Sequence, residues 1–161
     1  MQEILLQKLQ QYVSQNNPDL LFQLEKESKL TEYLTDKAST VKALIEQAGK
    51  GQPDYIIEET CMDILTMDLK PSRYNYIRGI FEEEFEKKFL LLSDTPLLQT
   101  EVINMISYCK EVFNEIGFTA ANEDDPFLRY NIIGAISEYI ESNSEKEIGG
   151  NELQQSTAFT P

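Results

Sequence analysis

The sequence contains no histidine among its 161 residues. Histidine is the commonest acid–base group near neutral pH and the commonest neutral metal ligand, so its absence removes both roles together. Ser-His-Asp and Cys-His nucleophile systems are excluded for the same reason. The di-iron and zinc motifs of helical enzymes also require histidine, and the sequence has neither a GxxxxGK[ST] phosphate loop nor a GxGxxG turn.

Cysteine occurs only at Cys61 and Cys109. Each falls on the apolar stripe of an expected helix, so we expect two buried, unreactive thiols. Two cysteines in a chain of this length do not make a disulfide framework, which favours a reducing compartment. Residues 1–8 show no basic region followed by a long apolar run, so we expect no signal peptide and a cytoplasmic protein.

Basic residues are half as numerous as acidic ones: 14 Lys and Arg stand against 28 Asp and Glu, for a net charge of −14. The excess is greatest after residue 110, where only Arg129 and Lys146 oppose ten carboxylates. Phosphate recognition needs clustered Lys and Arg, so we expect no direct nucleic-acid binding. The same charge repels anionic membranes, and no run approaches the roughly 18 apolar residues of a membrane span. A basic protein partner and simple solubility both stay open.

Apolar residues spaced three and four apart are abundant, which is the pattern of amphipathic helices. This spacing predicts an all-α fold, an irregular or orthogonal bundle of five or six helices. The expected helices cover residues 5–13, 30–48, 53–65, 74–89, 98–116 and about 126–141, and residues 19–28 form a turn or a short helical piece. Apolar residues cover nearly the whole circumference of the last helix over its first turns, so we expect it at the centre of the bundle. No strand pattern or internal repeat competes with this interpretation.

The expected domain spans residues 1–141, and residues 142–161 form a mobile polar tail in which Ser, Glu, Gly, Asn and Gln dominate. Five residues are typical of helix ends, with Ser28, Ser72 and Asp125 as N-caps and Gly49 and Gly117 as C-terminal residues. The predicted core contains Phe81, Phe85, Val102, Ile106, Cys109, Ile132 and Ile136.

Two glycines lie inside expected helices, where glycine costs roughly 1 kcal/mol relative to alanine. Gly79 falls on the face opposite Phe81, and Gly134 falls away from the apolar face of the last helix. Glycine on a polar face is explained either by another backbone that approaches it or by chance. The first explanation predicts a contact surface made of Asn75, Gly79, Glu82, Glu83, Glu86, Tyr130 and Gly134.

The many carboxylates allow one enzymatic alternative, a magnesium-dependent hydrolase. A helical site of this kind binds Mg²⁺ through Glu-x-x-Glu on one helix and a second acidic pair on the next, because Mg²⁺ requires several convergent oxygen ligands. Glu83 and Glu86 provide the first pair. The following helix places Asn104 and Asn114 where the second acid is needed, so only half of the motif is present. We therefore assign no catalytic, cofactor-binding or metal-binding residue.

The interpretation that uses most of these features is a protein-interaction module. An acidic surface suits a basic or amphipathic protein partner, or a second copy of the same chain. Tyrosine suits interfaces because it has a large apolar body and a polar tip. Four tyrosines fall near expected helix ends: Tyr55, Tyr74, Tyr76 and Tyr130. A DNA mimic is a further alternative, and it requires carboxylates arranged in two surface rows that imitate phosphate spacing.

Five short segments resemble a known family. They are Leu9-Gln10-Gln11-Tyr12, Asn17-Pro18-Asp19-Leu20, Ser72-Arg73-Tyr74, Ile80-Phe81-Glu82-Glu83-Glu84-Phe85 and Ile133-Gly134-Ala135-Ile136. Together with the long helix before Gly49, they are similar to a bacterial family named domain of unknown function eighteen ninety-six, over residues 1–141. The resemblance implies an all-α fold and no established activity, and it supplies no catalytic residues.

The charge excess predicts how stability responds to salt. Because 28 carboxylates outnumber 14 basic groups, repulsion between like charges dominates near neutral pH, and added salt screens it. We expect the melting temperature to stay constant or rise between about 10 and 150 mM NaCl, as measured by circular dichroism. A melting temperature that falls steadily over this range would show that attractive ion pairs dominate instead.

Overall fold

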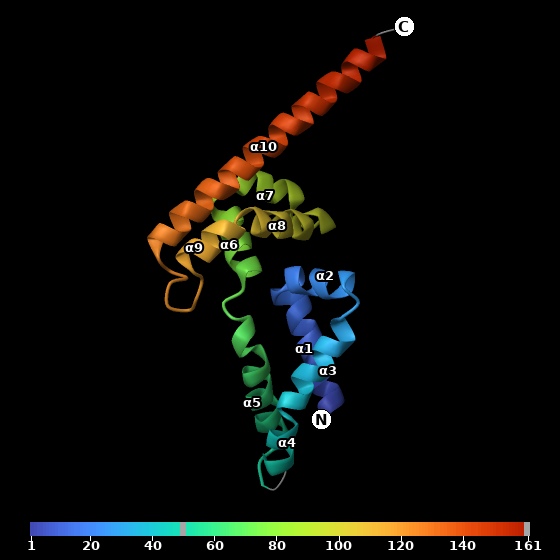
Figure 1. Cartoon of the computed structure of the whole chain (residues 1–161), viewed down its shortest axis with the longest axis vertical. Coiled ribbons are helices and arrows are strands. Elements are labelled where there is room, and N and C mark those ends of the chain that lie inside the picture. Colours follow the sequence, from blue (N-terminus) through green and yellow to red (C-terminus); the bar gives the residue numbers. More distant parts are fainter. Residues whose placement is uncertain (49–50, 160–161) are drawn as a thin grey trace. The chain divides into compact units, whose positions relative to one another are not determined.

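The structure, a computed structural model, describes residues 1–48 and 51–159, with side chains through residue 144. All regular secondary structure in these residues is helical, which confirms the predicted all-α class. Figure 1 shows the helices in chain order. They are α1 (Gln2–Asn16), α2 (Pro18–Lys26), α3 (Leu30–Thr40), α4 (Lys42–Ala48), α5 (Asp54–Thr66), the 3-10 helix η1 (Met67–Leu69), α6 (Arg73–Glu84), α7 (Glu86–Leu92), α8 (Pro96–Tyr108), α9 (Lys110–Ile116) and α10 (Pro126–Phe159).

The helices form two compact units, unit 1 (Met1–Tyr76) and unit 2 (Ile77–Pro161). The sequence predicts a single domain over residues 1–141, because a chain of this length fits one domain. Helical periodicity shows that a helix has a buried face but not which helix covers it, so it gives no sign of such a division. The backbone of α10 stays helical through Phe159, although a polar tail is predicted from residue 142. Glu and Gln, frequent in this stretch, are good helix formers. The mobility predicted for the tail lies outside what the structure describes.

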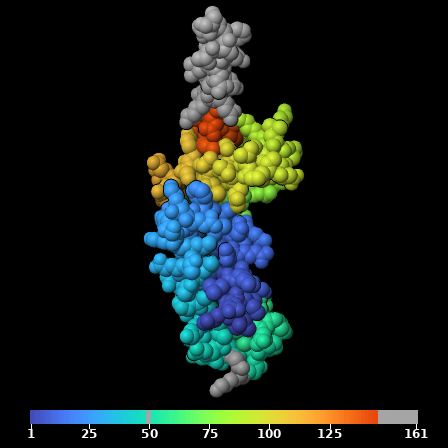
Figure 2. All heavy atoms as spheres, turned by 90° about the vertical axis from the view of Figure 1, so that its right-hand side faces the viewer, coloured from blue at the N-terminus to red at the C-terminus, as the bar shows by residue number. Residues whose placement is uncertain are grey.

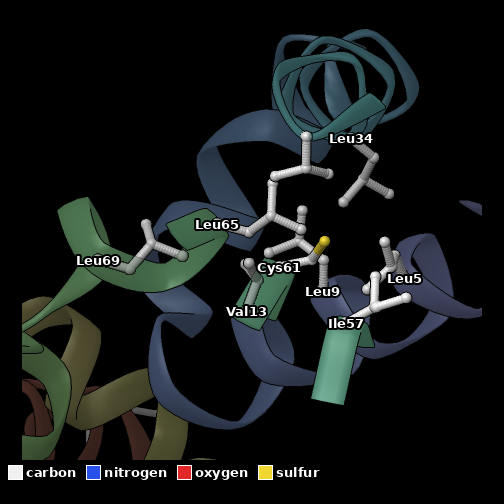
Figure 3. Packing of buried hydrophobic residues seen from close by; sticks show 9 residues of the cluster. Leu5, Leu9, Val13, Leu34, Ile57, Cys61, Leu65 and Leu69 are labelled. Atoms are coloured by element: carbon white, nitrogen blue, oxygen red, sulfur yellow. The ribbon is translucent and has the colours of Figure 1, made fainter. Parts of the chain in front are cut away.

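Unit 1 is organised around α1, α3 and α5, whose apolar faces meet in one cluster (Figure 3). The buried side chains of α1 are spaced four residues apart, which places them on one face of the helix. The cluster contains Leu5, Leu9, Val13, Leu34, Val41, Ile57, Cys61, Leu65 and Leu69. The two shorter helices complete the unit, since α2 packs on α1 and α3, and α4 packs on α3 and α5.

Three of the predicted long helices are each divided in two, which gives the pairs α3–α4, α6–α7 and α8–α9. Each joint is a single residue that departs from helical geometry: Val41 (φ −104°, ψ 1°), Phe85 (φ −132°, ψ 47°) and Cys109 (φ −86°, ψ 3°). Val41 and Cys109 are only 1% and 0% exposed, so the apolar stripe continues through both joints. A stripe that continues through a bend has the same sequence pattern as a straight helix, which is why the prediction merged these helices.

The helices α1–α5 and α6–α10 follow one five-helix pattern, and the boundary between units 1 and 2 falls in the first turn of α6. The joint after the first helix is Asn17 (φ −135°, ψ 53°) in unit 1. The corresponding joint in unit 2 is Phe85 (φ −132°, ψ 47°), which lies 68 positions later in the sequence. The joint after the third helix is Val41 in unit 1 and Cys109 in unit 2, again 68 positions later, and both residues have ψ close to 0°. Two matched joints at one spacing indicate a structural duplication.

Two further features agree with the duplication. Among the described residues, the non-glycine positions with positive φ are Ser28 (57°) and Asp94 (64°), and each lies between the second and third helix of its unit. A positive φ is uncommon outside glycine, so its recurrence in corresponding turns is informative. Buried positions also correspond in pairs: Leu9 and Ile77, Val13 and Phe81, Leu34 and Val102, Ala38 and Ile106, Ile57 and Leu128, Cys61 and Ile132, and Leu65 and Ile136. None of these pairs is identical, which explains why the sequence alone shows no repeat.

In unit 2, α10 packs on α8 and α9 (Figure 1). Its buried side chains are those of Leu128, Ile132 and Ile136, each 0% exposed. Phe127 and Tyr130, on the same turns, are 63% and 72% exposed. The helix therefore buries one face, and the expectation that other helices surround most of its circumference is not met.

Six of the seven predicted core residues are buried: Phe81, Val102, Ile106, Cys109, Ile132 and Ile136. Phe85 is half-buried because it forms the joint between α6 and α7. The Phe81 ring lies 6.4 Å from the Phe85 ring and 5.7 Å from the Phe89 ring, the latter edge to face. Aromatic pairs in this geometry stabilise beyond the area they bury, and these two hold α7 against α6.

The structure confirms three of the predicted helix-end residues and contradicts one. Ser72 caps α6, since its Oγ accepts the Asn75 amide N–H at 3.0 Å, and Asp125 Oδ1 accepts the Phe127 N–H at 2.9 Å at the start of α10. Gly117 follows α9 with φ +85°, as a C-terminal glycine does. Ser28 is not the N-cap of α3; its positive φ places it in the turn that ends α2. Gly49 lies outside the described residues.

Ser72 provides a test of the packing of unit 1. Besides capping α6, its hydroxyl donates to the carbonyl oxygen of Asn16 at the end of α1. Ser72→Ala removes both bonds and should lower the free energy of unfolding by about 1–2 kcal/mol in urea melts. Ser39→Ala is the control, because the exposed Ser39 hydroxyl only bonds the Asp36 carbonyl within α3, and it should change stability by less than about 0.5 kcal/mol. Equal losses for the two variants would contradict the assigned role.

Candidate functional site

The contact surface predicted around Gly79 is not one continuous stripe. Gly79, Glu82 and Glu83 lie on α6, but Glu86 is the first residue of α7, beyond the joint. Asn75, at the start of α6, donates its side-chain amide to another side chain of unit 1, Asn16 Oδ1, at 3.0 Å. The bend at the joint thus separates residues that an unbroken helix would align.

One contact brings together the two helices that carry the predicted surface, α6 and α10. The guanidinium of Arg129, in the first turns of α10, donates to Glu83 Oε2 at 2.8 Å and to Glu84 Oε1 at 3.1 Å. Glu83 therefore lies close to the turn of α10 that carries Tyr130, whereas Gly134 lies one turn further along. Both carboxylates are largely exposed, and exposed ion pairs contribute little to stability, so this contact orients α6 and α10 more than it stabilises them.

The same contact bears on the magnesium alternative. Glu83 is paired with Arg129 and lies on a different helix from Glu86, so the two carboxylates no longer form one i, i+3 pair. Within the described part of the chain, no group of three or more His, Cys, Asp or Glu side chains could hold a metal ion. Mg²⁺ needs several converging oxygen ligands, and these residues do not supply them.

Neither Gly79 nor Gly134 is explained by packing inside the described chain. A Cβ built at either position meets no atom within 4 Å, so no neighbouring backbone excludes a side chain there. Both glycines therefore face open space. Of the two explanations offered by the sequence, close approach of another backbone finds no support within this chain, and the surface stays a prediction.

The structure contains a feature that the sequence did not suggest, a groove in unit 2 formed by α6, α7, α8 and α10. Its volume is about 290 Å³. Apolar side chains from all four helices line it: Phe81, Leu91, Leu92, Met105 and Ile140. A pocket of this kind, apolar with a few polar groups at its edge, is the usual form of a binding site.

The groove lining also contains polar groups. The Lys88 ammonium of α7 donates to Ser144 Oγ of α10 at 3.2 Å. Glu101 of α8 is hydrogen-bonded to the Tyr139 hydroxyl, which Asn143 also contacts. Burial raises the pKa of Tyr139, and the bond to Glu101 raises it further, so the phenol stays protonated near neutral pH.

The tyrosine–carboxylate pair has a counterpart in unit 1. Tyr33 of α3 corresponds to Glu101 (33 + 68), and Asp68 after α5 corresponds to Tyr139 (68 + 71). Burial raises the pKa of Tyr33, and the charge of Asp68 raises it further. The two pairs differ in contact, since the Tyr33 hydroxyl makes no hydrogen bond to a described residue and Asp68 is paired with Lys37, whereas Tyr139 is hydrogen-bonded to Glu101.

Exposed leucines lie on α7 and at the start of α8, and one of them, Leu91, lines the groove. Leu90 and Leu91 of α7 are 60% and 79% exposed, and Leu97 at the start of α8 is 62% exposed. Figure 2 shows the yellow-green atoms of α7 at the surface beside the orange-red turns of α10. The run Phe89-Leu90-Leu91-Leu92 is the sequence signal that could have found this surface, because a helix cannot bury four consecutive residues on one face.

The chain matches a known protein family. The chain belongs to the family described as Domain of unknown function (DUF1896), which matches residues 5–144. The match begins in α1 and ends in α10 at Ser144, in the wall of the groove. No curated protein and no solved structure matches the chain significantly. In the part of the chain described, no helix is both long enough and apolar enough to span a membrane.

The glycines give a paired test. Because Gly79 and Gly134 face open space in helices, Gly79→Ala and Gly134→Ala should each stabilise the isolated protein by about 0.5–1 kcal/mol. Gly117→Ala is the contrast: with φ +85° and ψ 158°, alanine there should cost about 1–3 kcal/mol. Thermal melts beside sizing chromatography measure both effects. Destabilisation or altered assembly in Gly79→Ala would show instead that a second chain packs on α6.

The two thiols give a chemical test. Cys61 and Cys109 are buried as the sequence predicts. Burial raises the pKa of the Cys61 thiol, and it raises the pKa of the Cys109 thiol to about 12. Thiolate is the reactive form, so neither residue should react with a disulfide reagent at pH 8 in the native protein. Both should react once urea unfolds the chain. A thiol that reacts at once under native conditions would contradict its placement in the core.

Proposed function

We propose that the protein is an acidic helical interaction module that binds a basic or amphipathic segment of another protein in the cytoplasm. The observation that carries the proposal is the pair of consecutive exposed leucines on α7, Leu90 and Leu91, the second of which lines the groove of unit 2. Large aliphatic side chains exposed on a helix that forms the wall of a groove are typical of interaction sites.

Charge supports a basic partner. Residues 77–144 carry 13 acidic and five basic side chains, whereas residues 1–76 carry 12 and eight. The unit that exposes the leucines is thus the more acidic one. A negative surface around an apolar patch attracts cationic segments and repels nucleic acid and anionic lipid, which speeds encounter with a basic partner.

The other candidate functions have less support. A magnesium-dependent hydrolase would rely on Glu83, which is bound to Arg129. A DNA mimic would need rows of carboxylates, and no contact on the described surface favours it over the leucine surface. A second copy of the chain could occupy the same leucines, so self-association is an outcome of the test below.

The test compares partners recovered by tagged protein carrying single substitutions. Leu90→Ser and Leu91→Ser should each lose a basic partner that the wild-type protein recovers at low salt, because they remove exposed apolar anchors. Phe22→Ser is the matched control, since Phe22 is 57% exposed and occupies the position of Leu90 in the first copy of the motif (22 + 68). It should retain the partner.

Two results would contradict the proposal. One is an identical set of recovered proteins from wild type and both leucine variants. The other is a single species of twice the monomer mass in sizing experiments that reverts to monomer in Leu91→Ser, which would assign the surface to a second copy of the chain.

A further inference from the structure

The groove of unit 2 has an apolar floor and a small volume. Phe81 of α6 and Met105 of α8 line it and are each 1% exposed, so they form its deepest part. Leu92 of α7 and Ile140 of α10 add apolar walls. Its volume of about 290 Å³ lies at the lower limit of small-molecule pockets, roughly 300–1,000 Å³. The groove therefore suits a ligand with one large apolar side chain.

Two side chains of opposite charge, Lys88 of α7 and Glu101 of α8, line the same groove. Among the described residues, neither forms an ion pair, whether with the other or with a third residue. Both are instead hydrogen-bonded to neutral hydroxyls, Lys88 to Ser144 at 3.2 Å and Glu101 to Tyr139. An oppositely charged group interacts with each of them more strongly than a hydroxyl does. A ligand that brings one negative and one positive group therefore gains a partner at each.

Helix α10 positions these two charges on different walls of the groove. Tyr139 and Asn143 lie four residues apart and share one side of the helix, and Ser144 lies on the adjacent side. Glu101 is bonded on the first side, and Lys88 on the second. Asn143 and Ser144 also line the groove, and their amide and hydroxyl can each donate or accept a hydrogen bond.

We infer that the groove of unit 2 binds a free α-amino acid with a large apolar side chain, such as leucine. The side chain of the ligand occupies the floor between Phe81 and Met105. Its carboxylate pairs with the Lys88 ammonium, and its α-ammonium pairs with the Glu101 carboxylate. The inference goes beyond the proposed function, which concerns a protein partner at the exposed leucines of α7, and stands without it.

Other small apolar ligands match this lining less well. A fatty acid supplies a partner for Lys88 but leaves Glu101 beside an apolar chain, and an aliphatic amine does the reverse. The N-terminal residue of a protein has the ammonium and the side chain, but its carboxylate is used in a peptide bond. A free amino acid is the ligand that fits a small groove and carries both charges next to an apolar side chain.

Four small probes test each part of the ligand. L-Leucine is titrated into the full-length ¹⁵N-labelled protein at about pH 6.5, where α-amino groups are protonated. It should shift the amide resonances of Glu101, Met105 and Asn143 and saturate by about 10 mM. L-Alanine should bind about tenfold more weakly or worse, because it lacks most of the apolar side chain. L-Leucinamide lacks the carboxylate and 4-methylpentanoate lacks the amine, so each should bind roughly threefold more weakly or worse.

Two substitutions assign each charge to its partner. Lys88→Gln should weaken leucine binding roughly threefold and leave leucinamide unchanged, since leucinamide has no carboxylate to pair with Lys88. Glu101→Gln should weaken leucine binding to a similar degree and leave 4-methylpentanoate unchanged. Lys87→Gln and Glu115→Gln are the matched controls, because both residues are exposed and lie outside the groove lining, and both variants should bind leucine as the wild type does. The amide spectra verify that each variant is folded.

The inference fails if leucine does not saturate the groove by about 10 mM, or if the shifts are confined to residues outside it. Equal affinity for alanine and leucine would show that the apolar floor takes no part. Leucinamide that binds as tightly as leucine would assign the groove to the N-terminus of a protein chain instead. Leu90→Ser keeps this test apart from that of the proposed function: Leu90 lies outside the groove lining, so the variant should lose the protein partner and still bind leucine.

Discussion

Burial of one apolar face per helix is the interaction on which the rest of the structure depends. The chain has no disulfide and, in its described part, no metal cluster, and three of its helices, α4, α7 and α9, have only seven residues each. Helices this short are unstable alone in water, so they exist because neighbouring helices cover them. The joints at Val41 and Cys109 follow from the same requirement: both side chains are buried, and the chain bends there without interrupting the apolar face.

The duplication shows how one packing solution gives two different surfaces. Corresponding joints have nearly the same dihedral angles, and corresponding apolar positions are buried in both units. The copies differ where the last helix of each motif ends. In unit 1 the chain leaves α5, and Ser72 bonds the end of α1, whereas in unit 2 α10 continues. The corresponding positions therefore form an extended segment bonded to the end of α1 in unit 1 and part of an unbroken helix that lines the groove in unit 2.

The surface consequences concern charge and apolar exposure together. Unit 2 combines the larger acidic excess with the exposed leucines of α7, and the contact between Arg129 and the two glutamates of α6 orients the helix that forms one wall of the groove. Negative charge around an apolar patch keeps a protein soluble while it attracts cationic partners. The family match through Ser144 includes every residue of this arrangement.

The sequence by itself determined the all-α class, most of the core and the caps at Ser72 and Asp125. These follow from local rules, because helical periodicity and capping depend on residues within a few positions of one another. The tertiary structure decided the bends at Val41, Phe85 and Cys109, the division into two units and the groove. Each depends on which helix covers which face, and a periodic stripe of apolar residues carries no record of its partner. The predicted surface around Gly79 assumed one straight helix, and the joint at Phe85 separates its residues. The apolar run Phe89–Leu92 was the local signal for the exposed leucines of α7.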